Sequence, residues 1–456
     1  MRAIHCAGRT RPAFVPRGLS AWRSIAVKVT LAMAPWLAPP PGWAQNGDAP
    51  LSLAEAVRIA TAQSRRIAAA EHQTQAARDM AAAAAQRPDP VLKLGINNLP
   101  IDGTDRLSLT SDFMTMRSVA VMQELTRADK RAARAARAER EVDAAVVAQR
   151  QALAQLQRDT ALAWLERFYR QTLRDQLLGQ AREAELQVQA AQALVPSGKA
   201  SVADVLAARG QLEQVRDSVA LAERDIAVAG AQLARWVGAA AQRASAARPA
   251  FDAPLWTAST ELEAHLARHP LIEAAARQEA LAQADVAVAQ AERQADWSVE
   301  LMFSQRGPSF SNMVSLNFSL PLVWDSAQRQ DRELAAAQAR ARAAAADRDE
   351  QARAHAAELG EMLLAWHSHQ QRLARFDASL LPLAQQRLEA AQTAYRAGKG
   401  TLGEALAARR ALLALQVDRL GLEIMLAQRW AQITMLDAPA GLDEATARRP
   451  TSRSQP

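Results

Sequence analysis

The sequence predicts a mainly α-helical protein with a small β part, in which a unit of helix, β-hairpin, long helix, turn and helix occurs twice. Aromatic residues make up only 4% of the chain, and alanine, glutamine, arginine, glutamate and leucine dominate, which is typical of long packed helices. The stretch SGKASVADVLAARGQL at 197–212 is matched by AGKGTLGEALAARRAL at 397–412. Each half also contains segments in which apolar and polar residues alternate, the pattern of β-strands.

Residues 1–44 are predicted to be a secretory signal peptide. Arg23 and Lys28 precede a short apolar stretch, and Gly42 and Ala44 occupy the small-residue positions of a cleavage site. The alternative interpretation is a poorly ordered basic tail. The signal predicts that the rest of the chain is exported from the cytoplasm.

Composition narrows the classes of function further. Most of the formal net charge of +7 resides in residues 1–44, so the remaining chain has little electrostatic support for nucleic-acid binding. The single cysteine, Cys6, precedes the apolar stretch, so the exported chain would have no disulfide. No later apolar run is long enough for a transmembrane helix. No nucleophile–base motif, phosphate-binding glycine loop or zinc signature is found, and we therefore expect neither enzymatic activity nor a cofactor.

Each half of the remaining chain is predicted to open with an amphipathic helix, at 51–86 and again at 260–294. A β-hairpin follows in each half, about 90–125 in the first and about 297–323 in the second. Strands of about ten residues span the hydrocarbon core of a bilayer when tilted, although two small soluble hairpins capping a helical rod are the alternative. The predicted boundaries are 45–237 for the first repeat, 238–258 for a connector, 259–437 for the second repeat and 438–456 for a disordered tail.

Two very long helices are predicted after the hairpins, at 126–196 and 327–396, where the only prolines are Pro196 and Pro382. About 70 residues of helix reach roughly 105 Å. Apolar residues recur at steps of three, four and seven after each Gly-Lys turn, which indicates coiled-coil packing. Helices of this length therefore need partners along their whole extent.

The hairpins also constrain the assembly. Four strands cannot close into a barrel, and an open sheet edge is not tolerated in lipid. If the hairpins are membrane strands, three chains would supply 12 strands, an even number in the range of known barrels. The same three chains would combine their helices into a tube.

Taken together, the chain resembles the TolC family of outer-membrane efflux proteins over residues 51–437. The resemblance rests on the doubled order of elements, on the opening LSLAEAVRIA, and on the turn pattern AYRAGKGTLGEALAARRALL at 394–413. The stretch at 97–131, NNLPIDGTDRLSLTSDFMTMRSVAVMQELTRADKR, is similar to the heavy-metal (CzcC/CusC-like) members.

This resemblance implies a homotrimer with a 12-stranded β-barrel in outer-membrane lipid and a helical barrel in the periplasm of a Gram-negative bacterium. The helical end would meet a periplasmic adaptor (membrane fusion protein) and an inner-membrane pump, often of the resistance-nodulation-division class. The expected function is the exit duct of a tripartite efflux system for heavy-metal cations such as copper and silver, or cobalt, zinc and cadmium. A drug-efflux or type I secretion duct of the same fold is the alternative, and a periplasmic coiled-coil scaffold is a further one.

The two Gly-Lys turns are the first candidate site. Glycine permits the chain to leave a helix, and a serine or threonine three residues later is a natural N-cap for the next helix, which accounts for these residues without any partner. The resemblance implies that the same turns are periplasmic tips that contact the adaptor. The residues concerned are Gly198, Lys199, Ser201, Gly398, Lys399 and Thr401.

A periplasmic gate is the second candidate site, and it follows from the resemblance. Family members carry acids near the turn that narrow the closed pore, and Glu404 and Asp204 match this region. Three copies in a ring would repel one another and attract cations. The alternative is an acid that favours a helix N-terminus. Tyr395 matches a family tyrosine that latches the closed state, whereas a second family acid is Ala407 here.

No built metal site is predicted. His265 and His269 are spaced to share one helix face, but no third ligand follows at motif spacing. Met114, Met116 and Met122 carry thioethers that suit soft metal ions, although methionine also fills irregular apolar surface. Metal cargo therefore rests on the resemblance.

Overall fold

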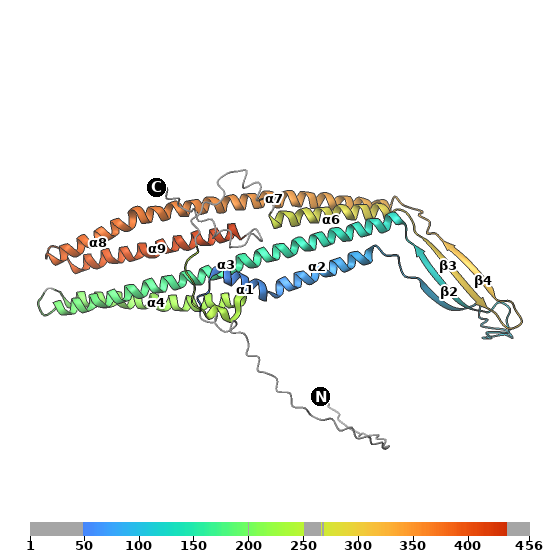
Figure 1. Cartoon of the computed structure of the whole chain (residues 1–456), viewed down its shortest axis with the longest axis horizontal. Helices are drawn as coiled ribbons and strands as arrows, with labels where there is room; N and C mark the ends of the chain where they lie inside the picture. The colour runs from blue at the N-terminus through green and yellow to red at the C-terminus, as the bar shows by residue number, and fades with distance from the viewer. Residues whose placement is uncertain (1–48, 199, 250–265, 267–268, 436–456) are drawn as a thin grey trace, which may run out of the picture. The chain divides into compact units, whose positions relative to one another are not determined.

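The computed structural model describes residues 49–198, 200–249, 266 and 269–435 (Figure 1). The predicted signal peptide, the C-terminal tail and part of the connector lie outside these residues. The elements of the first half are α1 (Leu53–Gln63), α2 (Arg65–Ala84), β1 (Val91–Asn97), β2 (Met116–Leu125), α3 (Ala128–Leu194) and α4 (Val202–Val237).

The second half repeats this order after a short 3₁₀ turn, η1 (Gly238–Gln242). Its elements are α6 (Pro270–Glu292), β3 (Trp297–Gln305), β4 (Met313–Ser319), α7 (Gln330–Arg375), the π-helical segment η2 (Phe376–Leu380), α8 (Leu381–Arg396) and α9 (Leu402–Thr434). The doubled order of helix, hairpin, long helix, turn and helix is confirmed.

The opening helix of each half is interrupted within the described residues, at Ser64 in the first half and at His269 in the second. The helix predicted at 51–86 is two helices, because the Ser64 side chain accepts a hydrogen bond from the Ile67 N–H at 3.3 Å and starts α2 anew. In the second half α6 begins at Pro270, whose missing N–H is not needed at a first helical position, and Leu266 before it is also helical. Residues 260–265 lie outside the described part of the chain.

The long helices differ between the halves. Helix α3 is continuous over 67 residues, about 100 Å, as predicted. The prediction of one helix over 327–396 is wrong in detail, because η2 interrupts it just before Pro382. Proline has no N–H to donate to the carbonyl of Ala378, and in η2 the Leu381 N–H bonds to the Phe376 carbonyl five residues back. The π segment thus lets the chain remain helical through the proline.

The four strands form one antiparallel sheet in the order β1-β2-β3-β4. The central pairing, β2 with β3, joins the two halves of the chain. Strands β1 and β4 have seven residues each, fewer than the ten predicted, because each pairs on one side only and its flanking residues have no ladder partner. The sheet therefore presents two edge strands.

Helix α3 is the centre of the packing. It lies against α4, α6 and α2, while α7 packs on α6 and α9, and α8 packs on α9. Trp164 of α3 and Trp366 of α7, which match in the two halves, are both fully buried in the main core. The Trp164 indole Nε1 donates to the Leu51 carbonyl at 2.9 Å, so this core also anchors the start of the described chain. None of the helices within the described ranges has the length and apolar character needed to cross a bilayer.

Candidate functional site

One face of the sheet is apolar from edge to edge. Because side chains alternate between faces along a strand, residues in register across the four strands share a face. Two complete rows on this face are Leu92, Val121, Leu301 and Leu316, and Leu94, Val119, Phe303 and Val314. These eight side chains are 47% to 73% exposed in the single chain. An exposed apolar surface of this extent marks a contact with lipid or protein.

The opposite face of the sheet carries most of the polar side chains of the strands, alongside Val91, Ala120, Met122 and Met302. Lys93 Nζ lies 2.6 Å from Glu300 Oε2, and Asn317 Nδ2 donates to Glu300 Oε1 at 3.4 Å. Serines 118, 298, 304 and 315 lie on the same side by register. A sheet that is apolar on one side and polar on the other is the pattern of strands that separate lipid from an aqueous lumen.

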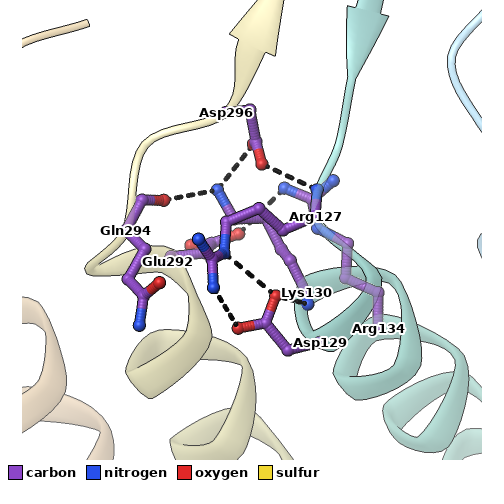
Figure 2. Close-up of polar contacts among 7 residues, drawn as sticks. All are labelled: Arg127, Asp129, Lys130, Arg134, Glu292, Gln294 and Asp296. Atoms are coloured by element: carbon purple, nitrogen blue, oxygen red, sulfur yellow. Dashed lines mark hydrogen bonds and ion pairs between the residues drawn. The ribbon is translucent and has the colours of Figure 1, made fainter. Parts of the chain in front are cut away.

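A buried ion pair joins the two halves where the helices meet the strands (Figure 2). Lys130, at the start of α3, places Nζ 2.6 Å from Asp296 Oδ2, between α6 and β3, and donates to the Gln294 carbonyl at 3.1 Å. The Arg127 backbone N–H donates to Asp296 Oδ1 at 3.0 Å. The side chains of Lys130 and Asp296 are only 7% and 14% exposed. We name these four residues the junction cluster.

Burial raises the pKa of Asp296, but the hydrogen bonds from Lys130 and from the Arg127 backbone outweigh it and bring the pKa below the ordinary value. The carboxylate is therefore charged at neutral pH. This cluster is not evident from the sequence, since the two residues of its ion pair are separated by 166 positions and neither stands in a recognisable motif.

The second Gly-Lys turn closes α8 by a Schellman motif. Gly398 has φ 69°, the left-handed region that glycine enters without strain. The Gly398 N–H bonds to the Tyr395 carbonyl at 3.0 Å, and the Lys399 N–H bonds to the Ala394 carbonyl at 2.9 Å. In the first turn Gly198 has φ 71°, and its N–H bonds to the Val195 carbonyl at 3.0 Å. The predicted helix-ending role of both glycines is confirmed; Lys199 lies outside the described residues.

The helices that leave the turns both begin with a capping box. The Thr401 side chain accepts from the Glu404 N–H at 3.2 Å, while Glu404 Oε2 accepts from the Thr401 N–H at 2.9 Å. Ser201 and Asp204 make the same pair of bonds, at 3.1 and 2.9 Å. The Ser201 backbone and side-chain donors lower the pKa of Asp204. Both predicted N-caps are confirmed, and both acids serve this local role.

The remaining predicted residues have mixed outcomes. Tyr395 lies in the last turn of α8, and its hydroxyl is buried without a hydrogen-bond partner among the described residues. The prediction that His265 and His269 share one helix face is wrong, because His269 is the N-cap residue of α6 and stands outside the helix; His265 lies outside the described range. The His269 ring instead lies 4.0 Å from the ring of His355 on α7. In the described part of the chain no three His, Cys, Asp or Glu side chains are placed to hold a metal ion.

Replacing Gly398 with alanine is expected to destabilise the helical part by about 1–2 kcal/mol, because an L-residue is strained at φ 69°. The matched control is Gly403→Ala, whose new Cβ would meet only the Thr401 Oγ1 at 3.8 Å. That change should be neutral or stabilise the protein by up to about 1 kcal/mol. Denaturant unfolding followed by far-ultraviolet circular dichroism measures both, and equal midpoints would contradict the expectation.

A duplicated set of long packed helices that carries strands with one lipid-compatible face defines the class of outer-membrane channel proteins. The chain belongs to the outer membrane efflux protein family, whose model matches residues 56–239 and 262–438. Members of this family are trimeric transport ducts of tripartite efflux systems and are not enzymes. The predicted TolC-type family and fold class are thereby confirmed.

Solved structures of such channels share the fold. The outer-membrane channel OprN is 20% identical with a TM-score of 0.71, over 84% of this chain and 89% of that one. CusC is 17% identical with a TM-score of 0.72, over 85% and 92%. VceC from Vibrio cholerae is 20% identical with a TM-score of 0.70, over 84% and 95%. No curated protein matches the chain.

Proposed function

We propose that three copies of this chain form an outer-membrane exit duct with a 12-stranded barrel and a periplasmic helical barrel. The observation that supports this proposal most strongly is the sheet. One of its faces is apolar across all four strands, and β1 and β4 are edge strands whose backbone groups are unpaired on one side. Free edges are not stable in lipid, and joining β4 of one chain to β1 of the next removes all of them. Three four-stranded sheets reach an even strand number in the known range.

In this assembly the rows that contain Leu92 and Leu94 contact the lipid of a Gram-negative outer membrane. The polar face, with the Lys93–Glu300 pair, lines the lumen, and the helices extend into the periplasm. Neither complete row places a charged side chain against the lipid, as barrels require. Arg117 shares the apolar face, but it is only the second residue of β2. There its guanidinium donates to the Arg306 carbonyl at 3.5 Å.

The Gly-Lys turns are proposed as the tips that contact a periplasmic adaptor, which links the duct to an inner-membrane pump, most simply of the resistance-nodulation-division class. Support comes from their construction: each turn ends one long helix with a left-handed glycine and begins the next with a capping box. Such turns are short. Lys399 and Thr401 are exposed in the second turn, as are Gly198 and Ser201 in the first.

Glu404, Asp204 and Tyr395 are proposed to form the periplasmic gate. In a trimer each acid would occur three times, and a ring of like charges attracts cations. The buried Tyr395 hydroxyl, without a partner in the described residues, is suited to a hydrogen bond that forms in the closed assembly. The capping boxes hold both carboxylates at fixed positions on their helices.

Glu404→Gln tests the gate charge, because glutamine can also complete a capping box and keeps the fold of the turn. We expect the trimer in planar bilayers to lose cation selectivity severalfold with little change in closed-state conductance. Glu404→Ala, which also removes bulk, is expected to raise the closed-state conductance. Unchanged selectivity and conductance in both variants would contradict a gate at Glu404.

The cargo is proposed to be heavy-metal cations such as copper and silver, or cobalt, zinc and cadmium. Support comes from the similarity of residues 97–131 to the heavy-metal members; the fold matches CusC and OprN equally well. A deletion strain is tested for growth on copper, silver, zinc, cobalt and cadmium and on a drug panel. Sensitivity to at least one metal is expected, and sensitivity to drugs alone would overturn the metal cargo.

A further inference from the structure

The two repeats make unequal contacts near the tips. In the chain, Leu406 of α9 packs against Ala184 and Val188 of α3, in a cluster that also includes Ala208 and Leu212 of α4, with Leu402 at its margin. We call this contact of α9 with the α3–α4 pair the intrachain seam. Leu406 is 6% exposed, so its side chain is fully inserted.

The equivalent residues of the other repeat differ in burial, although Ala408 and Leu412, the equivalents of Ala208 and Leu212, are buried as well. Counted from the Gly-Lys turn, Leu206 occupies the position of Leu406, and Ala384 and Leu388 occupy those of Ala184 and Val188. Leu206 is 61% exposed, and Ala384 and Leu388 are only half-buried. The segment η2 precedes these positions, so the register from the turn is unaffected. Each chain thus carries one buried leucine and one exposed leucine, and the helix surface at Ala384 and Leu388 is less covered than that at Ala184 and Val188.

An exposed apolar side chain on one surface and a complementary, partly exposed surface elsewhere on the same chain can form a head-to-tail contact between identical chains, which closes into a ring if the rotation permits. The intrachain seam shows that a leucine at this position packs well against the helix surface at the positions of Ala184 and Val188. Val202, the equivalent of Leu402, lies beside Leu206 and is 65% exposed. The partner that fits the surface at Ala384 and Leu388 is therefore α4 of a second copy.

The intrachain seam and the equivalent surfaces of the other repeat differ in charge. Arg409 forms an ion pair with Glu183, and Gln187, with its amide oxygen turned to the guanidinium, accepts from Arg409 Nη1 and Nε, both at 3.2 Å. In the other repeat the equivalent arginine is Arg209, which is exposed. The positions of Glu183 and Gln187 are taken by Leu383 and Arg387. A contact between Arg209 and the surface with Leu383 and Arg387 lacks the ion pair and brings Arg209 close to Arg387.

We propose that Leu206 and Val202 of one copy pack against Ala384 and Leu388 of the next, and that this interchain seam, rather than the intrachain one, parts when the periplasmic mouth opens. The inference rests on the proposed trimer and adds the residues that join the chains and the place of opening. Arg209 facing Arg387 weakens the interchain seam. The Arg409–Glu183 pair keeps α9 on α3 in both states.

Cysteine cross-linking tests the contact, since the only native cysteine is Cys6 and Cys6→Ser gives a cysteine-free background. Under oxidation Leu206→Cys with Leu388→Cys should give covalent dimers and trimers on denaturing gels. The matched control, Leu406→Cys with Val188→Cys, should cross-link within one chain and stay at monomer mass. Light scattering in detergent reports assembly independently. A trimer without interchain cross-links would overturn the seam alone, whereas absence of a trimer would overturn the proposed function.

An equivalent of the Arg409–Glu183 ion pair, introduced into the interchain seam, tests whether this seam parts when the periplasmic mouth opens. Leu383→Glu with Arg387→Gln reproduces Glu183 and Gln187 opposite Arg209. We expect the open probability of reconstituted trimers to fall about tenfold, because three seams each gain an ion pair. Adding Arg209→Ala should restore it. An unchanged open probability, or a fall that Arg209→Ala does not reverse, would show that the interchain seam does not govern opening.

Discussion

Replacing Leu316 with arginine is expected to prevent insertion of the trimer, at a cost of about 2–4 kcal/mol per chain. Leu316 lies at the middle of β4 on the apolar face, opposite Leu301, and its side chain is 57% exposed in the single chain. In the proposed barrel it faces the hydrocarbon core, where a guanidinium loses its hydration without gaining a partner. Three copies of the charge enter each barrel, so the cost is repeated in every trimer.

Ser315→Arg is the matched control, because Ser315 is the neighbouring residue of the same strand and faces the polar side. We expect Ser315→Arg to fold and insert nearly as well as the parent. The measurement is the fraction of heat-modifiable trimer recovered after refolding into lipid vesicles over a range of urea concentrations. Equal recovery of the two variants would mean that the apolar face does not meet lipid.

Replacing Asp296 with asparagine is expected to lower the free energy of unfolding by about 3–5 kcal/mol, because the ammonium of Lys130 is left buried without a counter-charge. Asparagine can still accept the hydrogen bond of the Arg127 N–H, so the effect reports the ion pair. The double variant Lys130→Met with Asp296→Asn removes both charges and should recover most of the loss.

Arg134→Met serves as the comparison for the junction cluster. Its guanidinium lies 3.1 Å from Glu292 Oε1, but both side chains are more than 40% exposed, so its loss should cost at most about 1 kcal/mol. Denaturant unfolding of the parent, of Lys130→Met, of Asp296→Asn and of the double variant provides a double-mutant cycle for Lys130 and Asp296. A loss at Asp296→Asn no larger than that at Arg134→Met would contradict a structural role for the buried pair.

The junction cluster also predicts a pH dependence. The folded-state pKa of Asp296 is lowered from the ordinary value of 3.8, so the folded state binds this proton less readily than the unfolded state. Its contribution is therefore fully present above the unfolded pKa and is lost as the pH falls from about 4 through the lowered pKa. The stabilities of the parent and of the single variant Asp296→Asn should therefore differ above pH 4 and converge in stronger acid, where the carboxyl of the parent is also neutral.

Much of the fold follows from local patterns in the sequence. The strands were predicted from their alternation, and the two turns from glycine followed by a hydroxyl residue, since a left-handed glycine and an N-cap act within a few residues. The break at Ser64 and the π segment before Pro382 are not evident from such local patterns. There, a single side chain or a missing N–H competes with an otherwise helical pattern. The prediction that His269 lies on a helix face was wrong for the same reason, because the histidine caps a helix that starts one residue later.

By itself the sequence determined the order of elements, the duplication and the register of the two turns, because these depend on residues close together in the chain. Only the tertiary structure decided that the two hairpins pair through β2 and β3, that Lys130 meets Asp296, and that Leu406 is inserted while Leu206 is free. The last difference arises between nearly identical segments. Which of two equal side chains is buried depends on what the rest of the chain brings beside it, and a local pattern carries no information about that neighbour.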